Sequence, residues 1–184
     1  MKKSFFLAIA LFGSLWLYYQ VDVKNVTHLP CAFCRQDVIE NQVFYRGEQV
    51  WGLLTYKPAT PGHVLIVPKR HVERFENLTA DELIEMKELI QKIDAAERRL
   101  FGNTGYLLLQ KNGSEAGQSV PHVHIHYLPR SKKESHLLFA ARFFLSPWLN
   151  SLSPIAMEEA IRALQSEIDR TPHLQRQDPL QAVI

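Results

Sequence analysis

The sequence has few of the features that mark a repetitive, disulfide-rich or strongly charged protein. Only two of its 184 residues are cysteine, and the net charge is +2 because 21 lysines and arginines nearly balance 19 aspartates and glutamates. No internal repeat or low-complexity tract is visible. Scattered, balanced charge predicts no nucleic-acid partner, because nucleic acids bind to clustered positive charge. A chain of this length can bury one sizeable core, so we expect one domain with appendages.

Residues 1–21 have the composition of a membrane-targeting segment. Lys2 and Lys3 precede an apolar run from Phe5 to Tyr19, which as a helix would extend about 22 Å against a hydrocarbon core of ~30 Å. A cleaved signal peptide ends in small residues, whereas this run ends in bulky ones. The pattern favours an uncleaved signal anchor with the domain outside the cytoplasm, on the periplasmic or extracellular side. A signal peptide cleaved from a secreted protein and a first helix packed on the domain are the alternatives.

The remaining sequence predicts five strands and two helices. Short apolar runs predict strands at residues 43–46, 49–54, 63–67 and 106–110, and a fifth that begins near His122. Thr79, with Glu82 three residues later, predicts the capped start of a long helix that ends near Leu100. Ser153-Pro154 predicts the start of a C-terminal helix. The aromatic-rich segment between residues 137 and 152 is too interrupted for a membrane span and is expected to be packed or interfacial.

Three of the eight histidines, His122, His124 and His126, occur at alternate positions. Successive side chains of a strand point to opposite faces, so the three histidines share one face and the apolar residues between them face the core. A neutral imidazole attacks phosphorus at physiological pH without the help of a strong base, which favours phosphoryl or nucleotidyl transfer. A catalytic metal centre is the rival use of such a cluster, but no carboxylate ligand accompanies the triad.

These histidines and their surroundings resemble the histidine triad (HIT) superfamily, in which three histidines alternate with hydrophobic residues. The matching run extends from Val43 to Arg130, about half of the chain, and is most similar to the dinucleoside polyphosphate hydrolase, or fragile histidine triad, branch. It includes Lys57-Pro58, Pro61-Gly62-His63-Val64-Leu65, Val72-Glu73-Arg74-Phe75 and Glu115-Ala116-Gly117-Gln118. The resemblance implies an α+β, HIT-like fold on an antiparallel sheet of about five strands. The HIT domain is expected at residues 22–136, followed by a C-terminal extension with a helix at 137–184.

The resemblance also implies roles for individual residues. His124 matches the nucleophile that forms a nucleotidyl-histidine intermediate, and His126 matches the third triad member, which binds or polarises the phosphate. His63 and His122 match residues that orient the nucleophile. His63 packs beside the triad and is also expected to contact the substrate. The residues expected to contact phosphate oxygens, the leaving group or the nucleotide are Gln118, Ser119, Gly117, Thr55 and Asn112. Small residues around Gly117 let backbone N–H groups approach a phosphate.

Two positions depart from the family pattern. The hydrolase branch has an asparagine just before Lys-Pro that contacts the ribose or the phosphates, whereas this chain has Thr55, two residues before Lys57. Many bacterial relatives read Asn-Asn-Gly where this chain reads Lys111-Asn112-Gly113. Both departures bear on how the nucleotide is oriented and, more strongly, on which substrate is chosen.

Both cysteines lie in the segment Cys31-Ala32-Phe33-Cys34. Such a pair is half of a tetrahedral zinc site or, in an oxidising compartment, a disulfide. Many members of the superfamily carry a C-x-x-C before the first strand and complete a zinc site with two histidines, for which the matching positions here are His71 and His122. The resemblance implies structural zinc held by Cys31, Cys34, His71 and His122, with a disulfide or free thiols as alternatives. No organic cofactor is expected.

Together these features predict a membrane-anchored HIT hydrolase that cleaves a nucleoside-phosphate bond of the dinucleoside polyphosphate type. Family members usually form dimers, so a homodimer is expected, for which Trp51 or the segment from Phe139 to Trp148 is a candidate contact. A nucleoside phosphoramidase or a nucleotidylyltransferase with the same histidines is the enzymatic alternative. A nucleotide-binding adaptor with residual activity is the alternative from another class, and Thr55 and Lys111 are the hints for it.

Overall fold

The structure, a computed structural model, describes residues 31–103, 105–132, 134–149 and 151–171. The segment 1–21, on which the prediction of a membrane anchor rests, lies outside these ranges. Within them, no helix is both long enough and apolar enough to cross a membrane.

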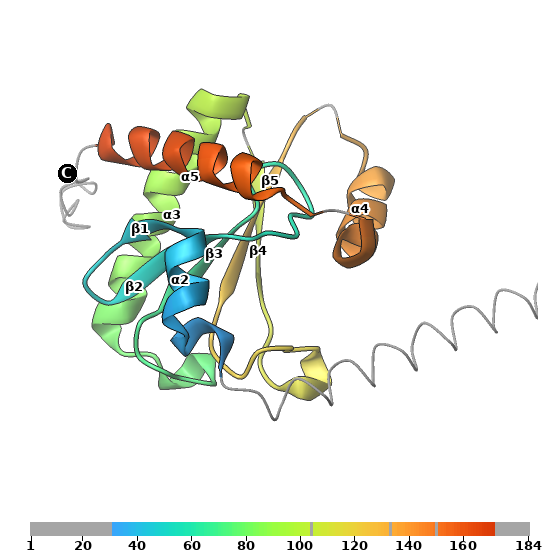
Figure 1. The fold of residues 1–184 in the computed structure, drawn as a ribbon. Helices are drawn as coiled ribbons and strands as arrows, with labels where there is room; N and C mark the ends of the chain where they lie inside the picture. Colours follow the sequence, from blue (N-terminus) through green and yellow to red (C-terminus); the bar gives the residue numbers. More distant parts are fainter. Residues whose placement is uncertain (1–30, 104, 133, 150, 172–184) are drawn as a thin grey trace, which may run out of the picture.

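Five short strands form one antiparallel sheet. Most of their residues are β-branched, leucine or aromatic, which suits a pleated and partly buried surface. The strands are β1 (Val43–Arg46), β2 (Val50–Leu54), β3 (Val64–Pro68), β4 (Gly105–Gln110) and β5 (Ile125–Arg130). They lie in the order β1-β2-β3-β5-β4, and every neighbouring pair is antiparallel (Figure 1). The α+β fold class and the antiparallel sheet of five strands are therefore confirmed.

The two predicted helices begin at their predicted caps. In front of α3 (Ala80–Phe101), the hydroxyl of Thr79 accepts a hydrogen bond from the amide of Glu82, and the Glu82 carboxylate accepts one from the amide of Thr79. This reciprocal capping box satisfies two amides that the first helical turn leaves unpaired. The hydroxyl of Ser153 caps α5 (Pro154–Asp169) in the simpler way, by accepting one amide hydrogen.

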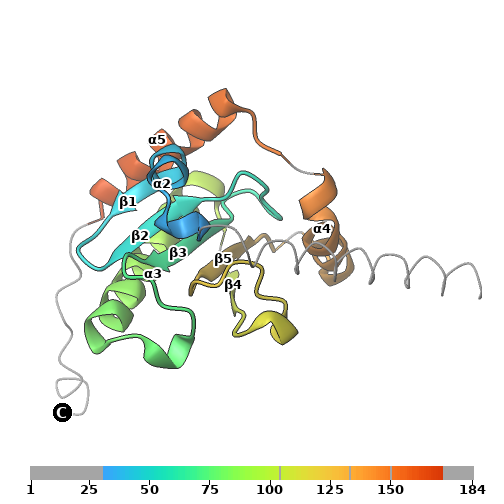
Figure 2. The same cartoon turned by 60° about the horizontal axis from the view of Figure 1, so that its bottom comes forward.

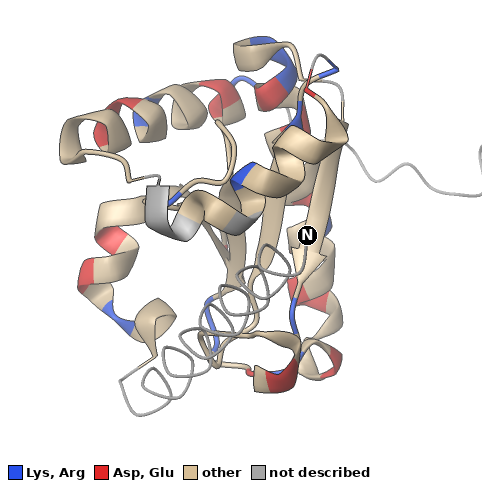
Figure 3. Ribbon diagram, turned by 90° about the vertical axis from the view of Figure 1, so that its right-hand side faces the viewer, with Lys and Arg blue, Asp and Glu red and all other residues tan. Residues whose placement is uncertain are grey.

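Two further helices are not predicted by the sequence pattern. The helix α2 (Gln36–Gln42) follows the short 3-10 helix η1 (Ala32–Cys34), and α4 (His136–Leu149) forms from the aromatic-rich segment. Arg142 is the one charged residue of α4 (Figure 3). The helix packs through Phe139, which contacts an apolar cluster at the β5 side of the sheet. In two views α4 lies beside β4 and β5, whereas α2 and α5 lie near β1 (Figure 2).

Alternation along the strands gives the sheet two apolar faces. In β3, Val64 and Ile66 belong to the core shared with α3 and α5, whereas Leu65 and Val67 belong to a cluster that includes residues of η1 and α2. In Figure 1, α5 crosses α3 on the first of these faces. Both faces of the sheet are therefore covered, and a polar group on either face must be accommodated inside the protein.

The strand β5 begins at Ile125 rather than near His122, so His126 lies in the strand, His124 directly before it and His122 outside it. Ile125 and Tyr127 belong to the core shared with α3, as predicted. Because side chains alternate, His124 and His126 point to the other face. The predicted division into a chemical face and a core face thus holds for His124 and His126, whereas the ring of His122 lies beside Cys31 and Cys34.

The strand β4 leaves an apolar edge on the sheet. Only β5 pairs with it among the strands that the structure describes. Its residues Tyr106, Leu107 and Leu108 are 42, 44 and 41 % exposed. An open strand edge offers unpaired N–H and C=O groups, and three consecutive large apolar side chains make this edge suited to contact with another protein surface.

Candidate active site

His124 is held so that one ring nitrogen keeps a lone pair. The residue lies directly before β5 and is buried. Its Nδ1 is 2.8 Å from the carbonyl oxygen of His122, and because a carbonyl only accepts, Nδ1 carries the hydrogen and donates it. Burial lowers the pKa of His124 below its usual range, so the ring is neutral at physiological pH. In this tautomer Nε2 has a lone pair and is the nucleophilic atom.

A hydrogen bond from His63 gives His126 the tautomer opposite to that of His124. Nδ1 of His63 accepts the amide hydrogen of Ala59 at 3.1 Å, so the neutral ring carries its hydrogen on Nε2. That Nε2 lies 2.9 Å from Nδ1 of His126 and donates to it. His126 therefore carries its own hydrogen on Nε2. Burial lowers the pKa of His63 to about 4 and also lowers that of His126, which keeps both rings neutral at neutral pH.

Neighbouring histidines thus offer complementary atoms. The ring centroids of His124 and His126 are 5.0 Å apart. The first ring presents a lone pair and the second an N–H donor. A phosphate group placed against them would meet a nucleophile for phosphorus and a hydrogen-bond donor for one of its oxygens.

A glycine turn in front of β3 positions His63. Gly62 has a φ of 79°, and a Cβ at this position would lie 2.2 Å from Oε1 of Glu97, so both the backbone and the space require glycine. Glu97 is fully buried, and its Oε2 accepts a hydrogen bond from Asn103 at 3.1 Å. Its Oε1 has no hydrogen-bond partner among the described residues. Burial raises the pKa of Glu97 to about 7.

Gln118 locks the loop between β4 and β5 to the histidines. The loop turns through η3 (Ser114–Ala116) between Gly113 and Gly117, which have positive φ values of 96° and 78°. Oε1 of Gln118 accepts the amide hydrogen of Gly113 at 2.7 Å, while its Nε2 donates to the carbonyls of Glu73 and His122 at 3.1 and 3.3 Å. Gln118 therefore supports the same carbonyl that orients His124, and its amide faces the protein behind the nucleophile.

The other predicted substrate contacts occupy different environments. Gly117 and Ser119 lie in the same loop, and Ser119 is exposed. Thr55 follows β2, and its hydroxyl accepts the amide hydrogen of the residue two positions later at 3.3 Å. Both amide atoms of Asn112 are bonded to residues of η2 (Phe75–Asn77), at 3.0 and 2.8 Å. The side chain of Asn112 is thus engaged away from the histidine pair.

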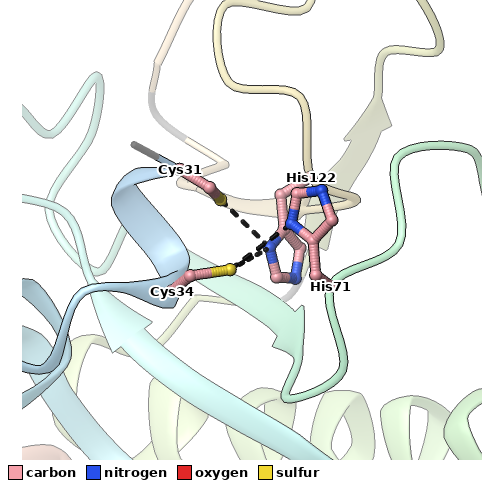
Figure 4. A group of neighbouring side chains, drawn as sticks. All are labelled: Cys31, Cys34, His71 and His122. Atoms are coloured by element: carbon pink, nitrogen blue, oxygen red, sulfur yellow. Dashed lines mark hydrogen bonds between the residues drawn. The ribbon is translucent and has the colours of Figure 1, made fainter. Parts of the chain in front are cut away.

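Four metal-ligating side chains meet beside His122. Cys31 and Cys34, at the two ends of η1, lie next to His71 and His122, and their candidate ligand atoms are all within 4.8 Å of one another (Figure 4). Sγ of Cys31 is 3.3 Å from Nδ1 of His122, and Sγ of Cys34 is 3.3 Å from Nδ1 of His71. Bond lengths of about 2.3 Å for Zn–S and about 2.0 Å for Zn–N place sulfur and nitrogen roughly 3.5 Å apart in a tetrahedron. The four residues therefore fit a tetrahedral zinc ion.

Both histidines of this group present the same nitrogen. Nε2 of His122 donates to the carbonyl oxygen of Pro68 at 2.9 Å, and Nε2 of His71 lies 3.6 Å from the carboxylate of Glu73. Each contact places the ring hydrogen on Nε2 and leaves the lone pair on Nδ1, which faces the sulfur atoms. Protein groups commonly orient metal-bound imidazoles in this way. The donor set is thus arranged for a metal without further rotation of its rings.

Two residues contribute to the site beyond what the sequence analysis assigns to them. Phe33, inside the C-x-x-C, is buried and places its ring 5.8 Å from that of His122 and 5.2 Å from that of His124. Lys111 follows β4, and its positive charge adds to the effect of burial in lowering the pKa values of His124 and His126. The place of Phe33 between two cysteines, and that of Lys111 at the end of a strand before the histidines, were the available signals.

Comparisons with known proteins agree with this geometry. The HIT domain family model matches residues 36–133. The chain is 36 % identical over 96 residues to the asymmetrical bis(5'-nucleosyl)-tetraphosphatase of Schizosaccharomyces pombe. The aligned residues make up 52 % of this chain and 53 % of that protein. It is 38 % identical over 93 residues to the bis(5'-adenosyl)-triphosphatase of Dictyostelium discoideum. Here the aligned residues make up 50 % of this chain and 62 % of that protein. The chain thus spans less than two thirds of the length of each of these two relatives.

A solved structure shares the fold. The diadenosine triphosphate hydrolase of Plasmodium falciparum, in complex with Cyclomarin A, superposes with a TM-score of 0.58 at 27 % identity. The superposition covers 71 % of this chain and 78 % of that chain.

These matches correct the predicted location. The relatives are named as dinucleoside polyphosphate hydrolases, and those named above are not described as membrane-anchored or secreted proteins. The prediction of a membrane-anchored or secreted domain outside the cytoplasm is therefore wrong. It rested on an apolar run that, as a helix of about 22 Å, is shorter than the ~30 Å hydrocarbon core of a bilayer.

Proposed function

Because the chain belongs to the HIT domain family, we propose that it is a nucleotide hydrolase that cleaves a nucleoside-phosphate bond of a dinucleoside polyphosphate through a nucleotidyl-histidine intermediate. The observation that carries this proposal is the pairing of opposite tautomers, a lone pair on Nε2 of His124 beside an N–H on Nε2 of His126. The names of the similar hydrolases support the substrate class.

The reaction proceeds in two displacements at one phosphorus atom. Nε2 of His124 attacks the phosphorus that carries the nucleoside, a P–N bond forms, and the P–O bond to the rest of the phosphate chain breaks. The leaving group departs as a phosphate anion. Water then attacks the same phosphorus, the P–N bond breaks, and the proton of the water is released to solvent. His124 returns to its starting tautomer and the nucleoside monophosphate leaves.

The surrounding residues divide the remaining tasks. His126 donates its Nε2 hydrogen to a phosphate oxygen, which stabilises the charge that develops as phosphorus is attacked. His63 fixes the tautomer of His126, and Gln118 together with the His122 carbonyl fixes that of His124. Gly117 and Ser119 border the place where the phosphates bind, and Thr55 and Asn112 remain predicted contacts of the nucleotide.

We propose that Cys31, Cys34, His71 and His122 hold a structural zinc ion. The support is their convergence, the sulfur–nitrogen distances of 3.3 Å and the orientation of both imidazoles by Pro68 and Glu73. A bound zinc ion would fix η1 and the His122 backbone relative to each other. No step of the reaction passes through it.

We also propose that the protein is a homodimer that pairs through the β4 edge. The support is three consecutive exposed apolar residues on a strand whose outer edge has no partner strand among the described residues. Trp51 and α4, which exposes Leu137, Leu138 and Leu145, are the alternative contacts. The HIT domain at residues 22–136 and the extension at 137–184 remain predicted bounds; between their described parts, Phe139 of the extension packs against Leu128 of the domain.

The covalent intermediate provides the test. Rapid quenching of the enzyme mixed with a dinucleoside polyphosphate labelled in the nucleoside should trap label on the protein through a bond that is acid-labile and alkali-stable, as expected for a phosphoramidate. His124→Ala should trap none and should lose turnover while keeping its fold, because one imidazole contributes little to packing here compared with its role as the nucleophile. Near-normal turnover of His124→Ala, or turnover that requires only an added transition metal, would refute the proposal.

A further inference from the structure

Lys111 stands next to the nucleophile by the register of the sheet. The antiparallel pairing of β4 and β5 matches Leu109 with His126 and ends with Gln110 opposite Ile125. Lys111 directly follows β4 and His124 directly precedes β5, so the same order continued by one residue sets Lys111 opposite His124. Leu109 belongs to the apolar cluster on the histidine face, and Lys111 two residues later is on the same face. The electrostatic influence of its ammonium on both His124 and His126 agrees with this placement.

The ammonium of Lys111 has no carboxylate partner among the described residues. Lys111 is partly buried, and no ion pair joins it to a carboxylate in the part of the chain that the structure describes. Burial lowers its pKa from the ordinary lysine value, and no acidic group is among the causes. A partly desolvated cation without a counter-ion gains more from a bound anion than a solvated surface lysine does.

A second cation near this loop, the guanidinium of Arg74 beside Gly113, is already paired with Glu76. The rings of His63 and His126 each accept a hydrogen bond at Nδ1, which requires a neutral imidazole. Gln118 is engaged with the protein. A dinucleoside polyphosphate brings several negative charges to these groups, and a neutral site compensates none of them. Lys111 is the one charged side chain that the register places beside the nucleophile.

We propose that Lys111 is the specificity-determining residue that selects substrates whose leaving group is an anionic phosphate chain, over substrates whose leaving group is an uncharged amine. This inference rests on the proposed hydrolase function. In both substrates the same P–N bond to His124 forms. In the polyphosphate the broken P–O bond leaves negative charge on phosphate oxygens, which the ammonium binds. In a phosphoramidate the broken P–N bond releases an amine that takes up a proton, so the ammonium has no leaving-group charge to stabilise.

The test compares one enzyme on two substrates. Lys111→Met should reduce kcat/KM for a dinucleoside tetraphosphate by about 10- to 100-fold, the range expected for one charge-assisted hydrogen bond. For a nucleoside phosphoramidate it should reduce kcat/KM by less than about threefold, since that substrate does not use the contact. Lys111→Arg keeps the charge and should retain most of the preference. Lys87→Met, which removes an exposed lysine of α3, is the matched control and should leave kcat/KM unchanged for both substrates.

A binding measurement separates this inference from the proposed function. In the His124→Ala background, calorimetric titration with inorganic tripolyphosphate should show about 10-fold weaker binding when Lys111→Met is added, with adenosine monophosphate affinity changed much less. If the wild-type enzyme fails to cleave dinucleoside polyphosphates but tripolyphosphate binding depends on Lys111, the proposed function fails and the charge-selective site stands. Two results would overturn the assignment of Lys111. The first is an equal loss of kcat/KM for both substrates; the second is no loss for either substrate together with unchanged tripolyphosphate binding.

Discussion

The carbonyl oxygen of His122 accepts the Nδ1 hydrogen of His124 at 2.8 Å, while the ring of His122 belongs to the four-residue metal-ligand group. One residue therefore joins two functions, its backbone to the nucleophile and its side chain to the cysteines. Gln118 donates to the same carbonyl. The orientation of the nucleophile thus depends on groups that never touch the substrate.

Removing the Gln118 amide is expected to slow chemistry more than it weakens binding. Gln118→Ala leaves the His122 carbonyl with one donor and frees the loop at Gly113, so His124 is less well oriented. We expect kcat to fall by on the order of 10²-fold or less with KM little changed. Steady-state kinetics of Gln118→Ala against Gln165→Ala, an exposed glutamine of α5, measure this. A raised KM at unchanged kcat would instead identify Gln118 as a direct contact of the bound substrate.

The contribution of Glu97 to stability is expected to become less favourable as pH rises. Its pKa in the folded protein is about 7, against 4.5 ordinarily. Between these values the unfolded chain has lost a proton that the folded protein keeps, so the folded state is progressively disfavoured, by up to about 3 kcal/mol. The buried histidines, whose pKa values are lowered, contribute the opposite trend below about pH 6.5. The fall due to Glu97 is therefore measured as the difference in urea unfolding between the wild type and Glu97→Gln, which should change in favour of Glu97→Gln between pH 5 and pH 8. The exposed Glu159→Gln is the control, and an unchanged pH dependence in Glu97→Gln would exclude Glu97 as its source.

Metal analysis tests the cysteine–histidine group. Protein purified without chelator should contain about one zinc per chain, which Cys31→Ser and Cys34→Ser should lose together with part of the thermal stability. His71→Ala should also lower zinc content, whereas His136→Ala, at an exposed histidine that begins α4, should not. A metal-free protein with a stable disulfide between Cys31 and Cys34 would show that the group serves as a cross-link.

Light scattering tests the proposed dimer. Leu107→Lys places a charge in the middle of the exposed β4 edge and should shift the protein from dimer to monomer, because a charge buried in an apolar interface without a partner is costly. Ile155→Lys changes a residue that is 72 % exposed on α5 and should leave the dimer intact. A monomeric wild-type protein, or an unaffected Leu107→Lys dimer, would argue against pairing through β4.

Local signals in the sequence predicted those elements whose causes are local. The capping box at Thr79 and Glu82 fixes the start of α3, and the two-residue period of the histidine strand separates His124 and His126 from Ile125 and Tyr127. The helix α4 was missed because its apolar content and its interruptions hide a helical period. The resemblance to a family also suggested the four metal-ligand residues, which lie far apart in the sequence.

Other features of the site depend on contacts that no local pattern contains. The tautomer of His63 is set by the Ala59 amide, and that of His122 by the Pro68 carbonyl. The commitment of Gln118 to three backbone groups is visible only once the loop is folded. The apolar run of residues 5–19 led to a wrong prediction of the protein's location. The composition of such a run does not decide whether it enters a membrane.

Apart from His63, the proposed catalytic machinery lies in one β-hairpin. The strands β4 and β5 pair with each other, and the connection between them carries Lys111, Gln118, His122 and His124. The connection is bounded by Gln110 and Ile125, which lie opposite each other in the sheet, so it can be exchanged as a single segment without changing the register of the sheet. Grafting this segment from another HIT protein would carry over the internal hydrogen bonds that orient the nucleophile, those of Gln118 with Gly113 and His122 and of His124 with His122, whereas moving single residues would separate them.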